Sequence, residues 1–390
     1  MRKKVCIGDL GSIVTGNTPP RNRPELYGNH TPFIKATDIS ESEKYTYNPE
    51  ECYSEEGYNK YIKSLIPKGS TCVVTIGSIG KKMTMAHCDL FINQAMNAII
   101  PNACFDSEYV YYAVKNVLGN IKTLDSGTAS GRENVSKSAF SKMEIWVEEE
   151  LPIQQRIATI LSRYDSLIEN YQKQIKLLEE SAQRLYKEWF IDLRFPGHEN
   201  TKIVDGVPEG WEKKKLVDLV DVQYGYAFDG KLFNSNREGM PILRIRNIPD
   251  GLTSDYTTEE ASNDYIAHNG DIVVGMDGIF HINSWSGDDA YLVQRTCSFR
   301  PKEEYMKGFV FQAIQEPIKF FEKTLVGATV AHLGKKHIDS IELCVPKNFE
   351  LYQPFSKFYN QRQGLLSQIR LLTEARDRLL PKLMSGEIEV

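Results

Sequence analysis

Residues 90–101 read LFINQAMNAIIP, and residues 290–301 read AYLVQRTCSFRP. Both stretches place a glutamine, Gln94 or Gln294, between apolar runs and end on a proline. Similar pairs surround them: 32–39 with 241–248, Val73-Val74 and Ile79 with Val273-Val274 and Ile279, and Gly127 with Gly327. Solenoid and propeller repeats have periods of about 20 to 50 residues, far shorter than this spacing. The sequence therefore predicts a duplicated domain.

An apolar segment with a helical period follows each copy. In 153–190 two neighbouring tracks repeat every seven residues, the first at Ile157, Tyr164, Tyr171, Leu178 and Leu185 and the second at Leu161, Ile168, Ile175, Ala182 and Trp189. In 355–380 the same spacing recurs at Phe358, Leu365, Leu372 and Leu379. A strict seven-residue period favours a left-handed supercoil. We therefore predict two helices paired antiparallel, with the two globular copies at opposite ends about a pseudo-two-fold axis.

The predicted fold class is α+β: two similar mixed α/β domains separated by two long antiparallel coiled-coil helices. The expected boundaries are 1–150 for the first domain, 151–197 for the first helical region, 198–350 for the second domain with a linker at 198–210, and 351–390 for the second helical region. Strands are expected at 71–76, 143–147, 271–274 and 341–345, and shorter helices at 109–117 and 306–321. The last helix is expected to stop or kink at Pro381 and to end at Gly386.

Composition narrows the class of protein. A chain of 390 residues exceeds one ordinary core. No apolar run approaches the roughly 18 residues that a membrane span needs. None of the seven cysteines forms a C-x-x-C pair, which predicts free thiols in the cytoplasm. The net charge of -5 by itself argues against nucleic-acid binding. Basic residues cluster locally, however, so a basic face on the protein remains possible.

Motifs of known catalytic sites are incomplete. Thr18-Pro19-Pro20-Arg21 lacks the amide or carboxylate and the aromatic ring found in amino-methylating enzymes. The stretch Gly77–Lys82 fails the P-loop pattern, which needs glycine in place of Thr75 and serine or threonine in place of Lys82. We therefore expect neither catalytic residues nor a metal site. Two alternatives stay open: a chain with its own methyltransferase or nuclease activity, and an assembly scaffold that does not touch DNA.

Polar loops occupy matching places in the two copies. Arginine and lysine suit phosphates and guanine edges, while asparagine and glutamine suit adenine. The DNA-binding candidates are Arg21, Arg23, Lys35, Thr37, Lys81, Lys82 and Arg132 in the first copy, and Arg237, Arg244, Arg246, Asn247, His281, Lys335 and Lys336 in the second. A repeated scaffold with different loop residues is what two different half-sites would require.

Four motifs resemble those of the specificity subunits of type I restriction–modification systems. They are LYKEWFIDLRFPGHE at 185–199, PEGWE at 208–212, RLLPKLMSGEI at 378–388 and LPIQQRI at 151–157. With the duplicated layout, the resemblance covers essentially the whole chain. Two features depart from it: the first half has no Pro-x-Gly-Trp-Glu opening, and the second helix begins with Gln353-Pro354-Phe355.

The resemblance implies a non-catalytic subunit whose two target-recognition domains each read one half of a split, asymmetric site in double-stranded DNA. It implies that the helices set the spacer and bind two modification (methyltransferase) subunits, which two restriction (translocase/endonuclease) subunits can join. S-adenosylmethionine, ATP and magnesium would sit on these partners, and none on this chain. The outward face of the first helix, with Lys176, Glu179, Arg184 and Lys187, is the expected partner surface.

Overall fold

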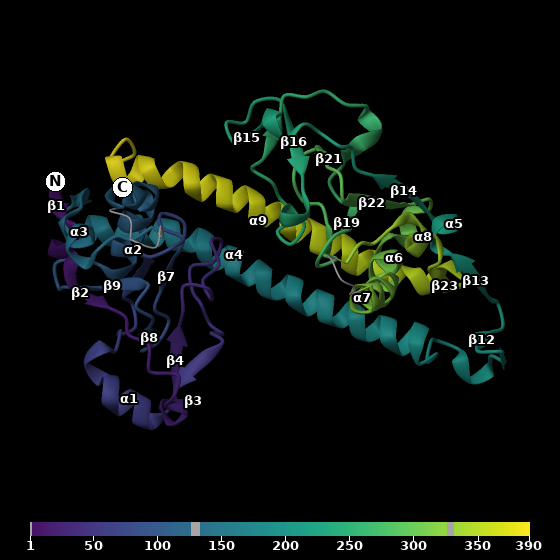
Figure 1. Cartoon of the computed structure of the whole chain (residues 1–390), viewed down its shortest axis with the longest axis horizontal. Coiled ribbons are helices and arrows are strands. Elements are labelled where there is room, and N and C mark those ends of the chain that lie inside the picture. The colour runs from purple at the N-terminus through teal and green to yellow at the C-terminus, as the bar shows by residue number, and fades with distance from the viewer. Residues whose placement is uncertain (1, 126–132, 326–330) are drawn as a thin grey trace. The chain divides into compact units, whose positions relative to one another are not determined.

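The computed structural model describes residues 2–125, 133–325 and 331–390. The chain forms two compact units, residues 1–169 with 371–390 and residues 170–370. Each unit therefore combines one globular module with part of each long helix (Figure 1). Within the described ranges, no helix is both long and apolar enough to cross a membrane.

The first unit is built on two four-stranded sheets. One has the order β2 (Gly11–Thr15), β9 (Met96–Pro101), β6 (Thr71–Val74) and β7 (Met83–Met85), and the other β3 (Tyr27–Gly28), β5 (Glu51–Tyr53), β4 (Thr31–Ile34) and β8 (Phe91–Ile92). A separate pair joins β1 (Arg2–Cys6) to β10 (Glu144–Glu148). The helices are α1 (Glu55–Tyr61), α2 (Ser107–Asn116), α3 (Lys137–Lys142), the start of α4 (Leu151–Tyr186) and the end of α9 (Gln353–Ser385), with short 3-10 helices η1 (Ile7–Leu10), η2 (Pro24–Leu26), η3 (Ile62–Ser64) and η4 (Leu118–Leu124).

The second unit repeats this plan. Its sheets have the orders β14 (Val220–Tyr224), β22 (Thr296–Pro301), β19 (Ile272–Gly275), β20 (Ile282–Ser284), and β15 (Phe233–Asn234), β17 (Tyr256–Thr257), β16 (Met240–Leu243), β21 (Ala290–Leu292), β18 (Ile266–Ala267). Two further pairs join β13 (Trp211–Lys215) to β23 (Glu342–Pro346) and β11 (Ile203–Val204) to β12 (Val207–Pro208). The remaining elements are α5 (Leu216–Leu219), α6 (Lys307–Ala313), α7 (Gln315–Thr324), α8 (Lys335–Asp339), the π-helical turn η5 (Lys187–Ile191) and the 3-10 helices η6 (His198–Asn200), η7 (Gly230–Leu232), η8 (Ile245–Asn247), η9 (Asn263–Tyr265), η10 (Glu304–Met306) and η11 (Phe349–Tyr352).

The matching strand orders confirm the duplication but shift the alignment of β6 with β19 by one residue. Val73 and Val274 both pack against the helices of their units, whereas Val273 belongs to the cluster beneath the second sheet. Strand pairing agrees, because Val74 is opposite Met96 and Gly275 is opposite Thr296. The alignment of Val73 with Val273 is therefore wrong, since a shift of one residue turns a strand side chain to the other face.

The predicted long helices are confirmed. In α4, the second track is buried at Leu161, Ile168, Ile175 and Ala182, as a helix packed along one stripe requires. The last helix, α9, ends at Ser385, before Gly386 with φ +77°. Of the stop or kink expected at Pro381, the stop is wrong, because α9 continues through this residue.

The expected helix 306–321 is also wrong as a single element. It is divided into α6 and α7 at Ile314. Pro317 falls in the first turn of α7, where a missing N–H costs no helical hydrogen bond.

Candidate nucleic-acid interface

One turn is held in the same way in both units. Gly16 and Gly225 follow the equivalent strands β2 and β14 and press against the turns that carry Gln94 and Gln294. A Cβ atom on Gly16 would lie 2.1 Å from the carbonyl oxygen of Asn93, and one on Gly225 would lie 2.2 Å from that of Val293. Only glycine allows this approach, so the loops that follow each strand lie directly beside the glutamine turn in both units.

Two basic candidates of the first unit lie beside the same carboxylate. Arg21 contacts Glu51 at 2.6 Å, and this hydrogen bond raises the pKa of Arg21. Lys35 lies between Glu50 and Glu51, and the hydrogen bond to Glu50 raises its pKa. A shared neighbour, Glu51, thus brings Arg21 and Lys35 together.

The other first-unit candidates are more scattered. Arg23 contacts Glu25 at 2.6 Å and Glu56 at 3.3 Å. Thr37 and Lys81 are exposed, and the Lys82 ammonium donates to the Ala36 carbonyl at 3.5 Å. Arg132 lies outside the described residues.

The second unit repeats one turn of the first. The Asn247 side-chain oxygen accepts from the Arg244 backbone N–H at 2.9 Å, as the Asp38 carboxylate accepts from the Lys35 N–H at 2.8 Å. The side-chain oxygen of Asn247 therefore stabilises the backbone turn between Arg244 and Asn247. Its neighbour Arg246 forms an ion pair with Asp255 at 2.6 Å.

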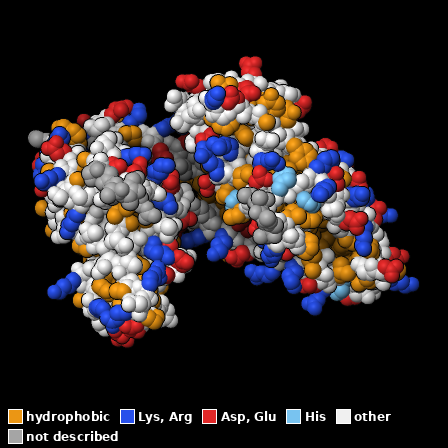
Figure 2. Space-filling model, viewed as in Figure 1, with side chains coloured by type: hydrophobic (Ala, Val, Ile, Leu, Met, Phe, Trp, Pro, Cys, Tyr) orange, Lys and Arg blue, Asp and Glu red, His pale blue; other side chains and the backbone are white. Residues whose placement is uncertain are grey.

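The remaining second-unit candidates are spread over several loops. Arg237 is exposed and has a left-handed backbone, φ +64°. The Arg244 guanidinium lies 5.3 Å from the centroid of the Phe233 ring, and His281 is half-buried. Lys335 forms an ion pair with Asp339 at 3.1 Å, and Lys336 is exposed. Figure 2 shows basic and acidic side chains intermixed on the visible face of each unit, which agrees with this pairing.

A group of three residues in the second unit was not identified as a site from sequence. Arg295, next to Gln294 on the turn, contacts Asp277 at 3.3 Å, and Asp277 contacts His332 at 2.6 Å. The first unit has Ala95 at the position of Arg295. A residue that differs within an otherwise matching turn is a signal that could have found it.

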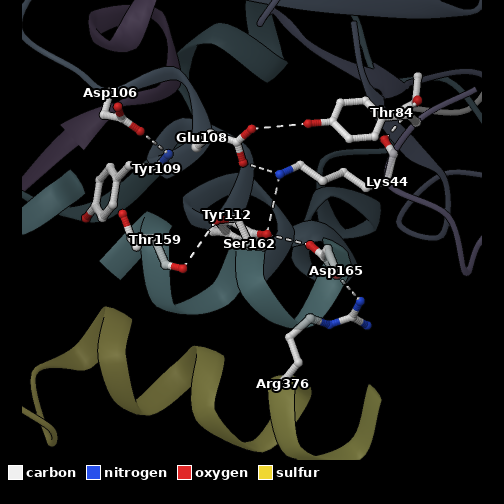
Figure 3. Close-up of polar contacts among 11 residues, drawn as sticks. Lys44, Thr84, Asp106, Glu108, Tyr109, Tyr112, Thr159, Ser162, Asp165 and Arg376 are labelled. Atoms are coloured by element: carbon white, nitrogen blue, oxygen red, sulfur yellow. Dashed lines mark hydrogen bonds and ion pairs between the residues drawn. The ribbon is translucent and has the colours of Figure 1, made fainter. Parts of the chain in front are cut away.

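The first unit joins its module to the long helices through a buried polar network (Figure 3). The Asp165 carboxylate on α4 accepts from Arg376 of α9 at 2.5 Å and from the Tyr112 hydroxyl of α2 at 2.5 Å. Burial and the Asp165 charge raise the pKa of Tyr112, so its hydroxyl remains a donor. The network extends through Lys44, whose ammonium contacts both Tyr112 and Glu108. We call Asp165, Arg376, Tyr112, Lys44 and Glu108 the first joint.

The second unit joins its module to the helices through a different arginine of α9. The Arg362 guanidinium donates to Glu179 of α4 at 2.6 Å and to the Asn283 side-chain oxygen at 2.7 Å, and it also contacts the Ser284 hydroxyl. We call Arg362, Glu179, Asn283 and Ser284 the second joint. Glu179 lies fourteen residues after Asp165, and Arg362 lies fourteen residues before Arg376. The joint residues are therefore two heptads apart in sequence on each helix.

One residue of the expected partner surface also belongs to the second joint. The Glu179 carboxylate pairs with the buried Arg362 of α9, while the Glu179 side chain is 44% exposed. Lys176, Arg184 and Lys187 are exposed, and Lys187 contacts Asp192 at 3.0 Å. A role for these four residues in binding a partner remains a prediction.

No group of three or more His, Cys, Asp or Glu side chains could hold a metal ion in the part of the chain that the structure describes. The polar residues gathered here are donors and charged groups on loops, and the two joints are made of paired side chains. This chemistry suits recognition of a polyanion and positioning of the recognising surfaces.

Comparison with known proteins points to one family. The type I restriction modification DNA specificity domain matches residues 2–180 and 208–369. The specificity subunit of the type I restriction enzyme MjaIX from Methanocaldococcus jannaschii is 28% identical over 412 residues, which cover 98% of this chain and 93% of that protein. The HindI specificity subunit from Haemophilus influenzae is 34% identical over 142 residues, which cover 36% of this chain and 30% of that protein.

A solved structure has a similar fold over nearly the whole length. The S subunit of a type I restriction-modification system from M. genitalium has a TM-score of 0.57 and 17% identity, and the match covers 98% of this chain and 96% of that one. At this identity the likeness concerns the fold.

Proposed function

The chain belongs to the type I restriction-modification DNA specificity family and serves DNA sequence recognition, and on that premise we propose how its parts divide the work. Each module reads one half of a bipartite, asymmetric site in double-stranded DNA. The paired helices α4 and α9 set the number of unread base pairs between the halves. The chain performs no catalysis of its own.

One observation carries this proposal: a shared scaffold presents different side chains. Gly16 and Gly225 hold equivalent turns against equivalent strands, yet the turns carry Gln94-Ala95 in one unit and Gln294-Arg295 in the other. A conserved frame with different reading residues is the arrangement needed to recognise two different half-sites.

The partners follow from the same proposal. Two modification subunits, which would bind S-adenosylmethionine, dock on the helical regions, with Lys176, Glu179 and Arg184 of α4 and Lys187 of η5 at the contact. Two restriction subunits, which would use ATP and magnesium, join them in the cytoplasm. The chain itself holds none of these cofactors.

The family function is tested by binding. The chain assembled with the modification subunit of its own system is titrated with duplex DNA that carries the methylated motif, over a range of salt concentrations. Phosphate contacts predict an affinity that falls steeply as salt rises. Lack of duplex binding by this complex would contradict a recognition role, and methyl transfer by the chain alone would contradict the non-catalytic assignment.

The spacer role is tested by a matched deletion of one heptad from each helix. Removing 169–175 and 366–372 leaves both joints in place, because these segments lie between Asp165 and Glu179 on α4 and between Arg362 and Arg376 on α9. Seven residues of helix are about 10 Å long, or about 3 base pairs. Methylome sequencing is expected to show unchanged half-sites and a spacer about 3 base pairs shorter. An unchanged spacer, or altered half-sites, would contradict the proposal that the helices set the length of the spacer.

A further inference from the structure

The turn that carries Arg295 borders a hollow in the second unit. The hollow has a volume of about 220 Å³, and its lining includes Gln294, Arg295, His332 and Lys335. These side chains come from the turn between β21 and β22 and from the segment before and at the start of α8. Donors from two separate segments thus converge on one concave surface.

Arg295 has an unfavourable backbone conformation that its surroundings impose. Its φ is +73°, in the left-handed region that residues with a Cβ rarely adopt. The Arg295 carbonyl accepts from the Met276 N–H at 2.8 Å, and the Gln294 N–H donates to the Tyr226 carbonyl at 2.7 Å. Strain of this kind persists at positions where function requires a particular direction of the side chain.

The guanidinium of Arg295 is oriented by two neighbours. Its Nε lies 3.3 Å from an Asp277 oxygen, and Nη1 lies 3.3 Å from Nε2 of His332. Nη1 also lies 3.4 Å from Nδ1 of His332, and this Nδ1 lies 2.6 Å from the other Asp277 oxygen, so the imidazole is held between the carboxylate and the guanidinium. Asp277 therefore faces Nε and His332 faces Nη1. Among the described residues, Nη2 has no hydrogen-bond partner.

We propose that Arg295 reads a guanine in the half-site of the second module, with Asp277 and His332 as positioning residues. The edge of the guanidinium formed by Nη1 and Nη2 donates to guanine O6 and N7, the bidentate pairing that the major groove offers to arginine. This inference rests on the proposed function, since it requires that the module lie on DNA.

A base contact explains the neighbours of Arg295 better than a phosphate contact does. Asp277 partly offsets the charge that would attract a phosphate, but it fixes the plane of the fork, on which base recognition depends. The first unit, with Ala95 at this position, lacks the fork altogether. The two modules are therefore expected to differ at this base pair.

The test is selection from a library of randomised duplexes by the chain assembled with the modification subunit of its system. The variants are Arg295→Gly, Arg295→Lys and, as a matched control on the equivalent turn, Ala95→Gly. Glycine removes the side chain and also relieves the left-handed backbone, so Arg295→Gly is expected to fold. Lysine keeps the charge but loses the fork.

The wild-type complex is expected to select a bipartite motif. Arg295→Gly is expected to lose on the order of 5- to 150-fold discrimination at one guanine of one half-site, with every other position retained. Arg295→Lys should weaken the same position, and Ala95→Gly should leave that half-site unchanged. Retention of the other half-site shows that the variants are folded.

Two results would overturn the inference. The full motif could persist in Arg295→Gly, or enrichment could fall equally at all positions, which would assign Arg295 to a phosphate. Failure of the proposed function is distinct from both, because the wild-type complex itself would then select no bipartite motif.

Discussion

Each joint connects a module to the long helices, but the charged side chains of the two joints are buried to different degrees. In the first joint both partners are buried, since the side chains of Arg376 and Asp165 are 7% and 8% exposed. In the second joint Arg362 is 9% exposed but Glu179 is 44% exposed. A carboxylate that loses its partner can be hydrated in the second joint but not in the first. Ion pairs at the same heptad position can therefore differ greatly in how much stability is lost when one partner is removed.

The difference originates in the modules. With the second module numbered 200 residues later, Tyr112 of α2 corresponds to Gln312 of α6, and Lys115 corresponds to Gln315. The tyrosine reaches Asp165 in the first unit, whereas in the second unit strand β20 supplies Asn283 and Ser284 to the arginine. Duplicated modules have thus kept their sheets and changed the groups that fasten them to the helices.

The largest expected effect is that of Arg376→Met. This change leaves the buried Asp165 charge without its cation, which should lower the free energy of unfolding by about 3–5 kcal/mol. The measurement is denaturant unfolding, with hydrogen exchange by mass spectrometry on peptides of α2 to locate the loss in the first unit. The triple variant Arg376→Met, Asp165→Leu, Tyr112→Phe removes the Asp165 carboxylate together with its two hydrogen-bond donors and should recover most of the stability. If Arg376→Met lost less than about 1 kcal/mol of unfolding free energy, burial of the ion pair would not explain how much its removal costs.

A smaller loss is expected from Arg362→Met. Glu179 can be hydrated, so the cost comes mainly from the lost hydrogen bonds to Asn283 and Ser284, about 1–3 kcal/mol. Hydrogen exchange of β20 peptides reports on this unit. Glu179→Gln is the matched variant on the exposed side and should cost less than about 1 kcal/mol. If Arg362→Met proves as damaging as Arg376→Met, the contrast between the joints is wrong.

The seven-residue periodicity predicted the long helices, but the face to which each strand side chain points could not be predicted from the sequence. Leu161, Ile168 and Ile175 repeat every seven residues, and this spacing alone indicates their packing. In contrast, the sequence pairs Val73-Val74 and Val273-Val274 are identical, yet Val73 and Val273 point to opposite faces of their sheets. The face is set by the register with the opposing strand. Pro381 lies inside α9 although proline usually ends a helix.

The candidate site was predictable only in part. The positions of the loops could be predicted from the repeat: Arg21 lies in a turn, Lys35 directly follows β4, and Arg246 lies in η8. Their carboxylate partners, such as Glu51 and Asp255, come from other segments, so the ion pairs depend on tertiary structure. The difference between Arg295 and Ala95 marks the position in the sequence, but the left-handed backbone of Arg295 and its contact with Asp277 depend on tertiary structure.

A separate prediction distinguishes the two units by the pH dependence of their stability. Burial chiefly, with help from Arg376, lowers the pKa of Lys115 from 10.5 to about 8, while Asp165 and Asp377 oppose the shift and Lys44 adds to it. Between pH 8 and 10.5 the unfolded chain binds a proton that the folded chain does not, so this group makes stability rise with pH across that window and lowers it most below pH 8.

Replacing the lysine removes this dependence. Lys115→Met should be more stable than the wild type at pH 7, and the difference should shrink toward pH 10.5, as measured by denaturant unfolding at a series of pH values. Gln315→Met is the matched control in the second unit, where the equivalent residue is uncharged, and its effect should not change with pH. A constant difference between Lys115→Met and the wild type from pH 7 to 10.5 would mean that Lys115 remains protonated in the folded chain throughout. The pH contrast between the two units would then not exist.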